Sequence, residues 1–259
     1  MELGLRGKTV LVTGGSRGIG LGVAKGFAAE GCDLHLASRS AENLAAAKGV
    51  IEQAHDVAVS VHALDLSAPG STAALAEAVG DVDILVNNAG AIPGGNLAAV
   101  DEARWREGWD LKVFGYVNLT RDYLARMTGR GDGVIVNVVG LAGEKPDVNY
   151  VAGSAGNASL MAFTRAVGST SLDRGVRVLA VNPGPVETDR IVNLLQTRAE
   201  ADHGDVERWR EYMAHWPQGR AAKVEECADL VVFAASDRAS YISGVVLTID
   251  GGLAARSPM

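Results

Sequence analysis

The sequence predicts a single α/β domain built on a parallel, doubly wound sheet. Near its start, a short apolar run is followed by a glycine-rich turn and then by an amphipathic run of helical length. Further along, strand-like apolar runs alternate with helical segments, which is typical of a parallel sheet covered by helices. With 259 residues, 47% of them hydrophobic, the chain is long enough for one large domain with a full core, so we expect residues 1–259 to form one domain.

Composition and charge argue against several functional classes. The formal net charge is −7 and no basic stripe interrupts it, which argues against a nucleic-acid partner. Cys32 and Cys227 lie far apart and form no disulfide framework, which favours a reduced, cytoplasmic setting. Residues 1–7 are too short and too polar for a signal peptide. No apolar run approaches the roughly 18 residues of a membrane span, so we expect no membrane association.

The glycine-rich turn predicts a dinucleotide site. It follows the apolar strand Thr9–Val12 and opens a helix expected over residues 19–30. Such a turn brings the backbone close to a pyrophosphate, and it aims the unpaired N–H groups and the positive dipole end of the helix at that anion. The candidate phosphate-binding residues are Gly14, Ser16, Arg17, Gly18, Ile19 and Gly20.

The end of the second expected strand favours NADP over NAD. Many dinucleotide folds place an acid about 20 residues past the glycine turn to bind the ribose hydroxyls. Here the strand Asp33–Ala37 is followed by Ser38 and Arg39. A carboxylate would repel a 2′-phosphate, whereas an arginine binds one bidentately, and Arg17 supplies a second cation. The alternative is that Arg39 only caps a solvated turn.

Two further strand ends carry candidate coenzyme residues. The third expected strand, over 58–64, ends in Asp65-Leu66, where Asp65 is placed to accept a hydrogen bond from the adenine amino group. The alternative is that Asp65 caps a helix beginning near Ala68. The fourth expected strand, over 83–86, runs into Asn87-Asn88-Ala89-Gly90. We expect its amides to hold neighbouring backbone in place, and Gly90 to let a coenzyme ribose pack against bare main chain.

Taken together with motifs near the C-terminus, these residues resemble the short-chain dehydrogenase/reductase family. The motifs are Thr13-Gly14-x-x-x-Gly18-x-Gly20, Asp65, Asn87-Asn88-Ala89-Gly90, Asn182-Pro183-Gly184, Tyr241-Ile242-Ser243-Gly244 and Asp250-Gly251-Gly252, and they extend from about Gly7 to Gly252. The resemblance implies a Rossmann-type fold with a seven-stranded parallel sheet and helices on both faces. It also implies an NAD(P)(H) coenzyme, a small-molecule substrate, and a homo-oligomer, either a dimer or a tetramer.

The catalytic set of that family is missing. Its carbonyl reductases use a serine at the end of the fifth strand, a tyrosine 13 residues later and a lysine four residues after that. In this chain the fifth expected strand covers 134–139, and the same count gives Gly140, Gly153 and Asn157. Gly153 and Gly156 lie near the start of a long helix, where they leave space either for close packing or for a bulky substrate.

Three other residues are the catalytic candidates. Lys112 stands where the family has an asparagine, so the chain carries a lysine on the earlier helix and Asn157 on the later one. Lys112 either reaches the site, to bind the nicotinamide ribose or lower a neighbouring pKa, or points to solvent with its stem along the helix. Tyr150 lies three residues before the expected tyrosine, either to transfer a proton or to line the pocket. Asn157 is a candidate amide donor to an oxyanion.

The sixth expected strand, over 177–181, leads to the last part of the site. The resemblance implies that the segment containing Pro183, Gly184, Val186 and Thr188 holds the nicotinamide carboxamide. We expect residues 189–219 to form a lid, whose aromatic side chains favour a substrate with apolar or ring character. The run Asp202–Asp205 is interpreted as a solvated turn, and we expect no metal.

The sequence therefore favours an NADP(H)-dependent oxidoreductase that transfers a hydride between a carbonyl and an alcohol, with the usual serine, tyrosine and lysine replaced. Two alternatives remain at this stage. One is a catalytically silent NADP-binding sensor or partner subunit, suggested by the loss of three catalytic positions. The other is a lyase, dehydratase or isomerase on the same fold that uses Lys112 as a base.

Overall fold

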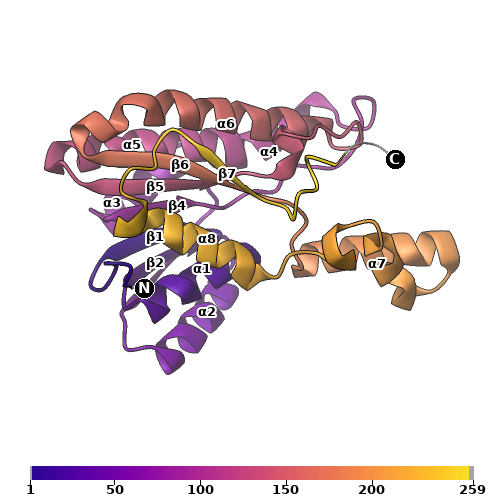
Figure 1. Ribbon diagram of the computed structural model, residues 1–259, viewed down its shortest axis with the longest axis horizontal. Coiled ribbons are helices and arrows are strands. Elements are labelled where there is room, and N and C mark those ends of the chain that lie inside the picture. The colour runs from indigo at the N-terminus through magenta and orange to yellow at the C-terminus, as the bar shows by residue number, and fades with distance from the viewer. Residues whose placement is uncertain (1, 257–259) are drawn as a thin grey trace.

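The computed structural model describes residues 2–256 and contains one seven-stranded parallel sheet (Figure 1). The strand order is β3-β2-β1-β4-β5-β6-β7. The strands are β1 Thr9–Thr13, β2 Asp33–Ser38, β3 Val59–Ala63, β4 Ile84–Asn87, β5 Gly133–Val138, β6 Val176–Pro183 and β7 Val246–Ile249. The expected parallel, doubly wound sheet of seven strands is confirmed.

Helices cover both faces of the sheet (Figure 1). The helices are α1 Gly18–Ala29, α2 Ala41–Ala54, α3 Ser71–Val79, α4 Glu102–Trp109, α5 Gly115–Arg130, α6 Val151–Ser171, α7 Asp189–His203 and α8 Val224–Ala235. One apolar cluster joins α1, α2 and α8 to side chains such as Val10 and Val12, and a second joins α3 and α5 to side chains such as Leu11. Because neighbouring residues of a strand point to opposite faces, β1 contributes to both layers.

The strand order reverses between β1 and β4, and this reversal determines where a ligand-binding site lies. β1 pairs with β2 on one side and with β4 on the other, so the chain segments that leave β1 and β4 diverge at their carboxyl ends. In open parallel sheets, ligands bind in the crevice at this point. The carboxyl ends face the α7 side of the molecule, at the right of Figure 1.

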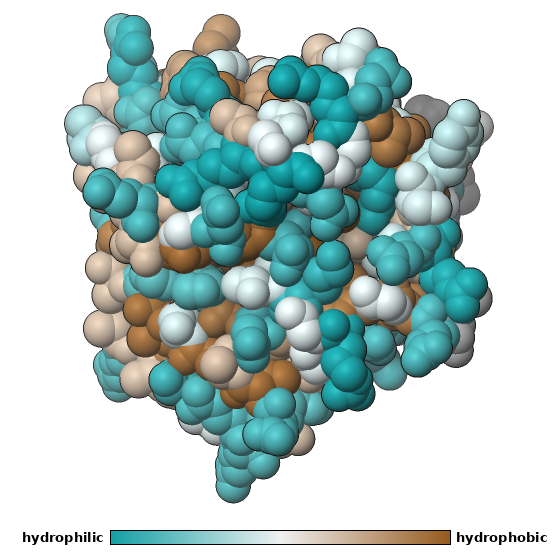
Figure 2. All heavy atoms as spheres, turned by 90° about the vertical axis from the view of Figure 1, so that its left-hand side faces the viewer, coloured by the Kyte–Doolittle hydropathy of each residue, from teal (hydrophilic) through white to brown (hydrophobic). Residues whose placement is uncertain are grey.

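The opposite end of the sheet is shown in Figure 2, where hydrophilic side chains cover most of the surface and hydrophobic atoms are exposed in small areas between them. Within residues 2–256, no helix has both the length and the apolarity needed to cross a bilayer.

The segment 189–219 folds as α7 followed by two short 3₁₀ segments, η4 Val206–Met213 and η5 Pro217–Gly219, and it extends away from the sheet at the right of Figure 1. Trp209 and Met213 are buried in a small core of their own with α7 residues Leu195 and Ala199. The aromatic side chains of the expected lid therefore lie mainly on 3₁₀ turns, and Trp209 is buried within the segment.

Candidate coenzyme and active site

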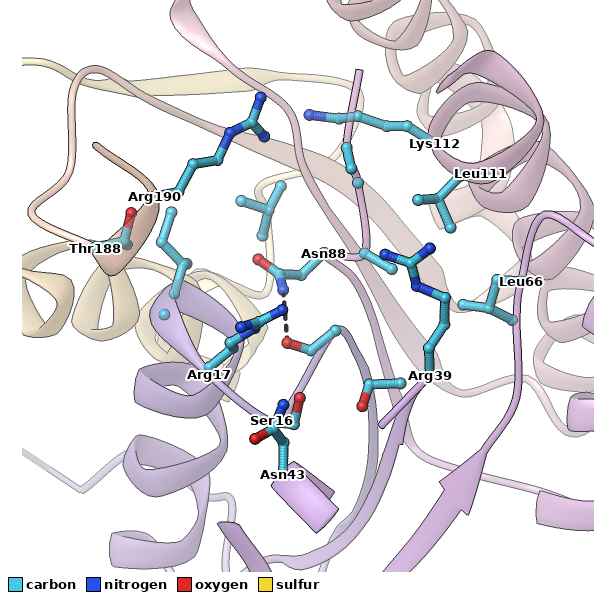
Figure 3. Close-up of a pocket in the computed structure, with 18 of the residues that line it drawn as sticks. Ser16, Arg17, Arg39, Asn43, Leu66, Asn88, Leu111, Lys112, Thr188 and Arg190 are labelled. Atoms are coloured by element: carbon cyan, nitrogen blue, oxygen red, sulfur yellow. Dashed lines mark hydrogen bonds between the residues drawn. The ribbon is translucent and has the colours of Figure 1, made fainter. Parts of the chain in front are cut away.

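A cavity of about 680 Å³ opens at the carboxyl ends of the strands (Figure 3). Many of the expected coenzyme residues line it, namely Gly14, Ser16, Arg17, Gly18, Ile19, Ser38, Arg39, Leu66, Ala89, Gly90 and Thr188. Six others do not line it: Gly20, Asp65, Asn87, Pro183, Gly184 and Val186.

The turn after β1 needs its glycines for two reasons. Gly14 and Gly18 have φ values of +65° and +57°, which favour glycine. A Cβ on Gly20 would collide with the carbonyl oxygen of Gly14, so this position admits no side chain. The N-terminus of α1 has no side-chain cap, which leaves its first N–H groups free for an anionic ligand.

The segment after β4 fixes this turn, as expected from its amides. Asn88 Nδ2 donates to the carbonyl oxygens of Thr13 at 3.0 Å and Gly14 at 3.3 Å (Figure 3). The Thr13 hydroxyl in return accepts from the Asn88 and Ala89 N–H groups at 2.9 and 3.0 Å. Its neighbour Asn87 instead lies in the core between the strands, where its Nδ2 donates to Asn137 Oδ1 at 2.9 Å.

Arg17, Arg39 and Ser38 are polar side chains of the cavity wall without a protein partner in the described residues. Arg17 and Arg39 appear in none of the ion pairs of residues 2–256, and the buried Ser38 hydroxyl has no hydrogen-bond partner in that range. The cap of α2 is the neighbouring Ser40, whose hydroxyl accepts from the Asn43 N–H at 3.2 Å. Arg39 is therefore not the cap, and its guanidinium is available to a ligand.

Asp65 is engaged locally. One of its carboxylate oxygens accepts from the Ser67 N–H at 3.0 Å and from the Ser67 hydroxyl at 2.7 Å. These hydrogen bonds, and to a smaller extent the charge of Arg39, hold the pKa of the Asp65 carboxyl below its usual value. The carboxylate thus stabilises the turn at Ser67. The alternative that Asp65 caps the next helix is wrong, because α3 begins at Ser71 after Gly70 and has no side-chain cap.

Lys112 reaches the cavity. It lies in a π-helical turn, η1 Asp110–Phe114, inserted between α4 and α5, and such insertions are frequent at functional sites. Its Nζ donates to the Val139 carbonyl at 3.0 Å, and its stem packs on Gly90, where a Cβ would lie only 2.7 Å from Lys112 Cδ. Burial, followed by the charge of Arg190, lowers the pKa of Lys112 from 10.5 to about 8. The alternative that Lys112 points to solvent is wrong.

Tyr150 occupies the space above Gly153. A Cβ at position 153 would collide with the Tyr150 ring, so the phenol lies where a side chain of residue 153 would begin. Burial raises the pKa of Tyr150, and the charge of the nearby Arg190 guanidinium opposes this shift. Tyr150 does not line the cavity itself, although it is close enough to Arg190 for that charge to affect its pKa.

Asn157 and Gly140 are neighbours behind the cavity wall. A Cβ at Gly140 would lie 3.3 Å from the Asn157 amide. Asn157 Nδ2 donates to the Gly153 carbonyl at 2.9 Å, while its Oδ1 is buried without a partner. Gly156 packs against Ile92 and Trp109, so close packing explains this glycine. Of the three expected catalytic side chains, Lys112 alone lines the cavity.

Arg190, in the first turn of α7, was not among the candidates from the sequence. Its Nη2 donates to the Ile92 carbonyl at 3.2 Å, and Figure 3 shows its guanidinium and the Lys112 ammonium reaching toward each other from opposite walls. The available signal was its place, two residues past Thr188, at the start of the expected lid. Asn193 also lines the cavity from one turn further along α7.

The segment after β6 forms the base of the site. The Gly184 N–H donates to the Ile249 carbonyl at 2.9 Å, and the Thr188 N–H donates to the Val186 carbonyl at 2.8 Å. Thr188 is thereby presented at the cavity wall beside Gly18, where a Cβ would lie 3.3 Å from Thr188 Cγ2.

The aromatic side chains of segment 189–219 do not line the cavity; α7 contributes Asp189, Arg190 and Asn193 instead. The expected substrate with apolar or ring character therefore stays a prediction, without support from these aromatics. Across residues 2–256, no group of three or more His, Cys, Asp or Glu side chains is placed to hold a metal ion.

Comparisons with known proteins show the family of the chain. A family model described as short chain dehydrogenase matches residues 8–199. The chain is 34% identical to a galactitol 2-dehydrogenase (L-tagatose-forming) of Cereibacter sphaeroides, over 96% of this chain and 95% of that one. It is 32% identical to an uncharacterized oxidoreductase, YvrD, of Bacillus subtilis, over 98% of both chains.

Solved structures are similar over almost the whole chain. The L-sorbose reductase from Gluconobacter frateurii, complexed with NADPH and L-sorbose, has a TM-score of 0.94 and 30% identity, covering 99% of this chain and 100% of that one. A 3-oxoacyl (acyl-carrier-protein) reductase from Agrobacterium tumefaciens with NADP bound has a TM-score of 0.87 and 29% identity, covering 96% and 95%.

Proposed function

Since the chain belongs to the short-chain dehydrogenase family, we propose that it is an oxidoreductase that uses NADP(H) to interconvert a carbonyl and an alcohol, with Lys112 as the proton donor. One observation carries this proposal. A single cavity combines a glycine-rich turn, two arginines that form no ion pair within residues 2–256, and a lysine whose pKa is lowered to about 8.

The cavity residues fit NADP(H). The turn from Gly14 to Gly18 and the uncapped N-terminus of α1 suit a pyrophosphate. Arg17, Arg39 and the unpartnered Ser38 hydroxyl suit the additional phosphate on the adenosine ribose. When bound, the coenzyme supplies or accepts the hydride.

The proton is assigned to Lys112 because of its environment. An amine with a pKa of about 8 exchanges protons readily near neutral pH, which is what a general acid requires. One of its three N–H bonds is directed to the Val139 carbonyl, and the other two are available to a substrate oxygen. Tyr150 has a raised pKa, so its phenol stays neutral and acts as a positioning group beside Arg190.

Steady-state oxidation of NADPH against a panel of ketones, aldehydes and quinones tests this assignment. Loss of a positioned general acid costs roughly 10²- to 10⁴-fold, so Lys112→Met is expected to lower kcat/KM by about this factor without changing the Kd for NADPH. Tyr150→Phe is expected to lower kcat/KM less than Lys112→Met does.

In the direction of carbonyl reduction, kcat/KM is expected to be constant below about pH 8 and to fall above it, as the Lys112 ammonium loses its proton. A Lys112→Met protein as active as the parent would contradict the assignment.

A second function is favoured by one specific observation. Gly140 has no hydroxyl, and Asn157 and Tyr150 do not line the cavity, which is compatible with an NADP-binding protein that has no catalytic turnover. Tight NADPH binding by fluorescence titration, with no turnover of any compound in the panel, would favour this sensor or partner-subunit role. Conversion of a substrate without stoichiometric NADPH would favour a lyase or dehydratase.

The proposal extends to segment 189–219 as a cover for the substrate, because the first turns of α7 already contribute Asp189, Arg190 and Asn193 to the wall.

A further inference from the structure

Two cations face each other at the end of the cavity away from Arg39. Lys112 and Arg190 come from opposite walls, and their charged groups point into the space between them (Figure 3). Neither belongs to any ion pair of the described residues. Asp189 is the one acid among the cavity-lining residues in 2–256, and it forms no ion pair with either cation. This end of the cavity therefore has a surplus of positive charge.

That surplus is unfavourable unless an anion balances it. A guanidinium stays protonated under all ordinary conditions, so it cannot relieve the repulsion by losing its proton. The repulsion instead disfavours the charged form of Lys112, since the nearby guanidinium contributes to the lowering of the Lys112 pKa. An anion placed between the two groups would be attracted by both and would hold the lysine in its charged form.

The geometry leaves Arg190 free to bind such an anion. Its Nη2 donates to the Ile92 carbonyl at 3.2 Å, and the Tyr150 phenol is nearby. The guanidinium carries five N–H donors in a planar fork, so most of them remain unused. A fork anchored at one nitrogen is suited to two parallel hydrogen bonds with a carboxylate.

We propose that the substrate carries a carboxylate, which the Arg190 guanidinium binds while Lys112 faces the reacting oxygen. The substrate class is thus a keto acid or hydroxy acid, and Arg190 is the residue that selects it. The inference rests on the proposed function and deepens it. The other anion that Arg190 is able to bind is the pyrophosphate of the coenzyme, and the experiment separates the two.

The test compares matched neutral and charged compounds. The probes are 2-oxo and 3-oxo acids of increasing chain length, each paired with its methyl ester. Binding to the NADP⁺-saturated protein is measured by calorimetry, which needs no turnover, and NADPH oxidation is measured in parallel. We expect at least one acid to bind about tenfold or more tightly than its ester, the effect of one charge-assisted bidentate contact.

Variants then assign the effect to one side chain. Arg190→Gln is expected to remove the preference for the acid by raising the KM of the acid about tenfold or more, with little change in kcat. The affinity for the ester and the Kd for NADPH are expected to stay unchanged. Arg190→Lys is expected to restore part of the preference, because it keeps the charge but not the fork. The control is Arg198→Gln, on the exposed side of the same helix, where Arg198 pairs with Asp202.

Two results would overturn the inference. One is that no acid binds better than its ester. The other is that Arg190→Gln weakens NADPH binding while acids and esters bind alike, which would assign the guanidinium to the pyrophosphate. If acids bind preferentially but nothing is turned over, the carboxylate site stands and the proposed redox function fails.

Discussion

At the scale of single residues, Lys112 carries a charge that its surroundings disfavour. Its pKa is lowered from 10.5 to about 8, and each pKa unit corresponds to about 1.4 kcal/mol. The charged form is therefore destabilised in the folded protein by about 3 kcal/mol at neutral pH. Between pH 8 and 10.5 the unfolded chain keeps this proton while the folded chain has lost it, so the contribution of Lys112 to stability rises with pH through that window.

This gives a stability prediction. Lys112→Met is expected to be more stable than the parent at pH 7, by about 2 to 3 kcal/mol. The difference should shrink as the pH rises from 8 toward 10.5, since the parent then folds with a neutral amine. Urea denaturation at pH 7 and pH 10 measures both values. Lys145→Met, which removes an exposed lysine, should change stability little at either pH. A Lys112→Met protein less stable at pH 7 would mean that the hydrogen bond to Val139 outweighs the cost of burial.

Residues whose role is set by the backbone were the ones that the sequence could predict. The glycines of the first turn and the Asn88 amide act on main-chain atoms at fixed spacing, and both expectations agree with the structure. Arg190 was missed because its role depends on the carbonyl of Ile92, 98 residues away, which no local pattern encodes. For the same reason the sequence left open whether the Lys112 side chain points into the cavity. It does so because Gly90, which is distant in the sequence, has no side chain and leaves room for the lysine stem.

At the scale of elements, a buried arginine joins β6 to the end of α8. Arg177 is 6% exposed, and its guanidinium donates to the last two carbonyls of that helix, those of Ala234 at 2.6 Å and Ala235 at 2.8 Å, and to the carbonyl of the C-cap Ser236 at 3.0 Å. A helix C-terminus leaves these carbonyls without partners and has a negative dipole end, so a cation there is stabilising. Burial lowers the pKa of Arg177, with nearby carboxylates opposing the shift.

Arg177→Met should consequently destabilise the fold. The methionine side chain fills the space of the aliphatic part of the arginine, but three buried carbonyls lose their hydrogen-bond donors. Leaving such groups unsatisfied costs about 2 to 4 kcal/mol in total. Urea denaturation measures this loss, and Arg165→Met, on the exposed face of α6, serves as the control. The NADPH affinity of the folded variant should stay unchanged, because β6 begins at the end of the sheet opposite the cavity. A variant as stable as the parent would show that water replaces the guanidinium.

The order of strands and helices followed from the sequence, but their irregularities did not. The spacing of apolar residues predicts where strands and helices lie, because buried side chains recur at a constant period along each regular element. The π-helical turn at Asp110–Phe114 and the 3₁₀ segment at Val206–Met213 have no such period. The aromatic side chains of the second predict a lid over the substrate, whereas Trp209 packs inside the segment itself.

At the scale of the whole molecule, the cavity exists only when the sheet is folded. Its walls come from the ends of β1 to β6 and the segments after them, from η1 and from the start of α7, which lie far apart in the sequence. A ligand of the cavity has no site on the unfolded chain, so it stabilises the fold by an amount set by its concentration and its Kd. Coenzyme preference should therefore be visible as a difference in thermal stability.

NADPH at one hundred times its Kd is expected to add about 2.7 kcal/mol of stability, or about 5 °C in Tm for a chain of this size. NADH at the same concentration is expected to raise Tm less, because it has no ribose phosphate for Arg17 and Arg39 to bind. Arg39→Ala should bring the two shifts closer together by lowering the NADPH shift and leaving the NADH shift unchanged. Lys25→Ala, on the outer face of α1, is the control for charge alone. Differential scanning fluorimetry with both coenzymes measures these shifts, and equal shifts by NADPH and NADH in the parent would contradict the assignment of the two arginines to the phosphate.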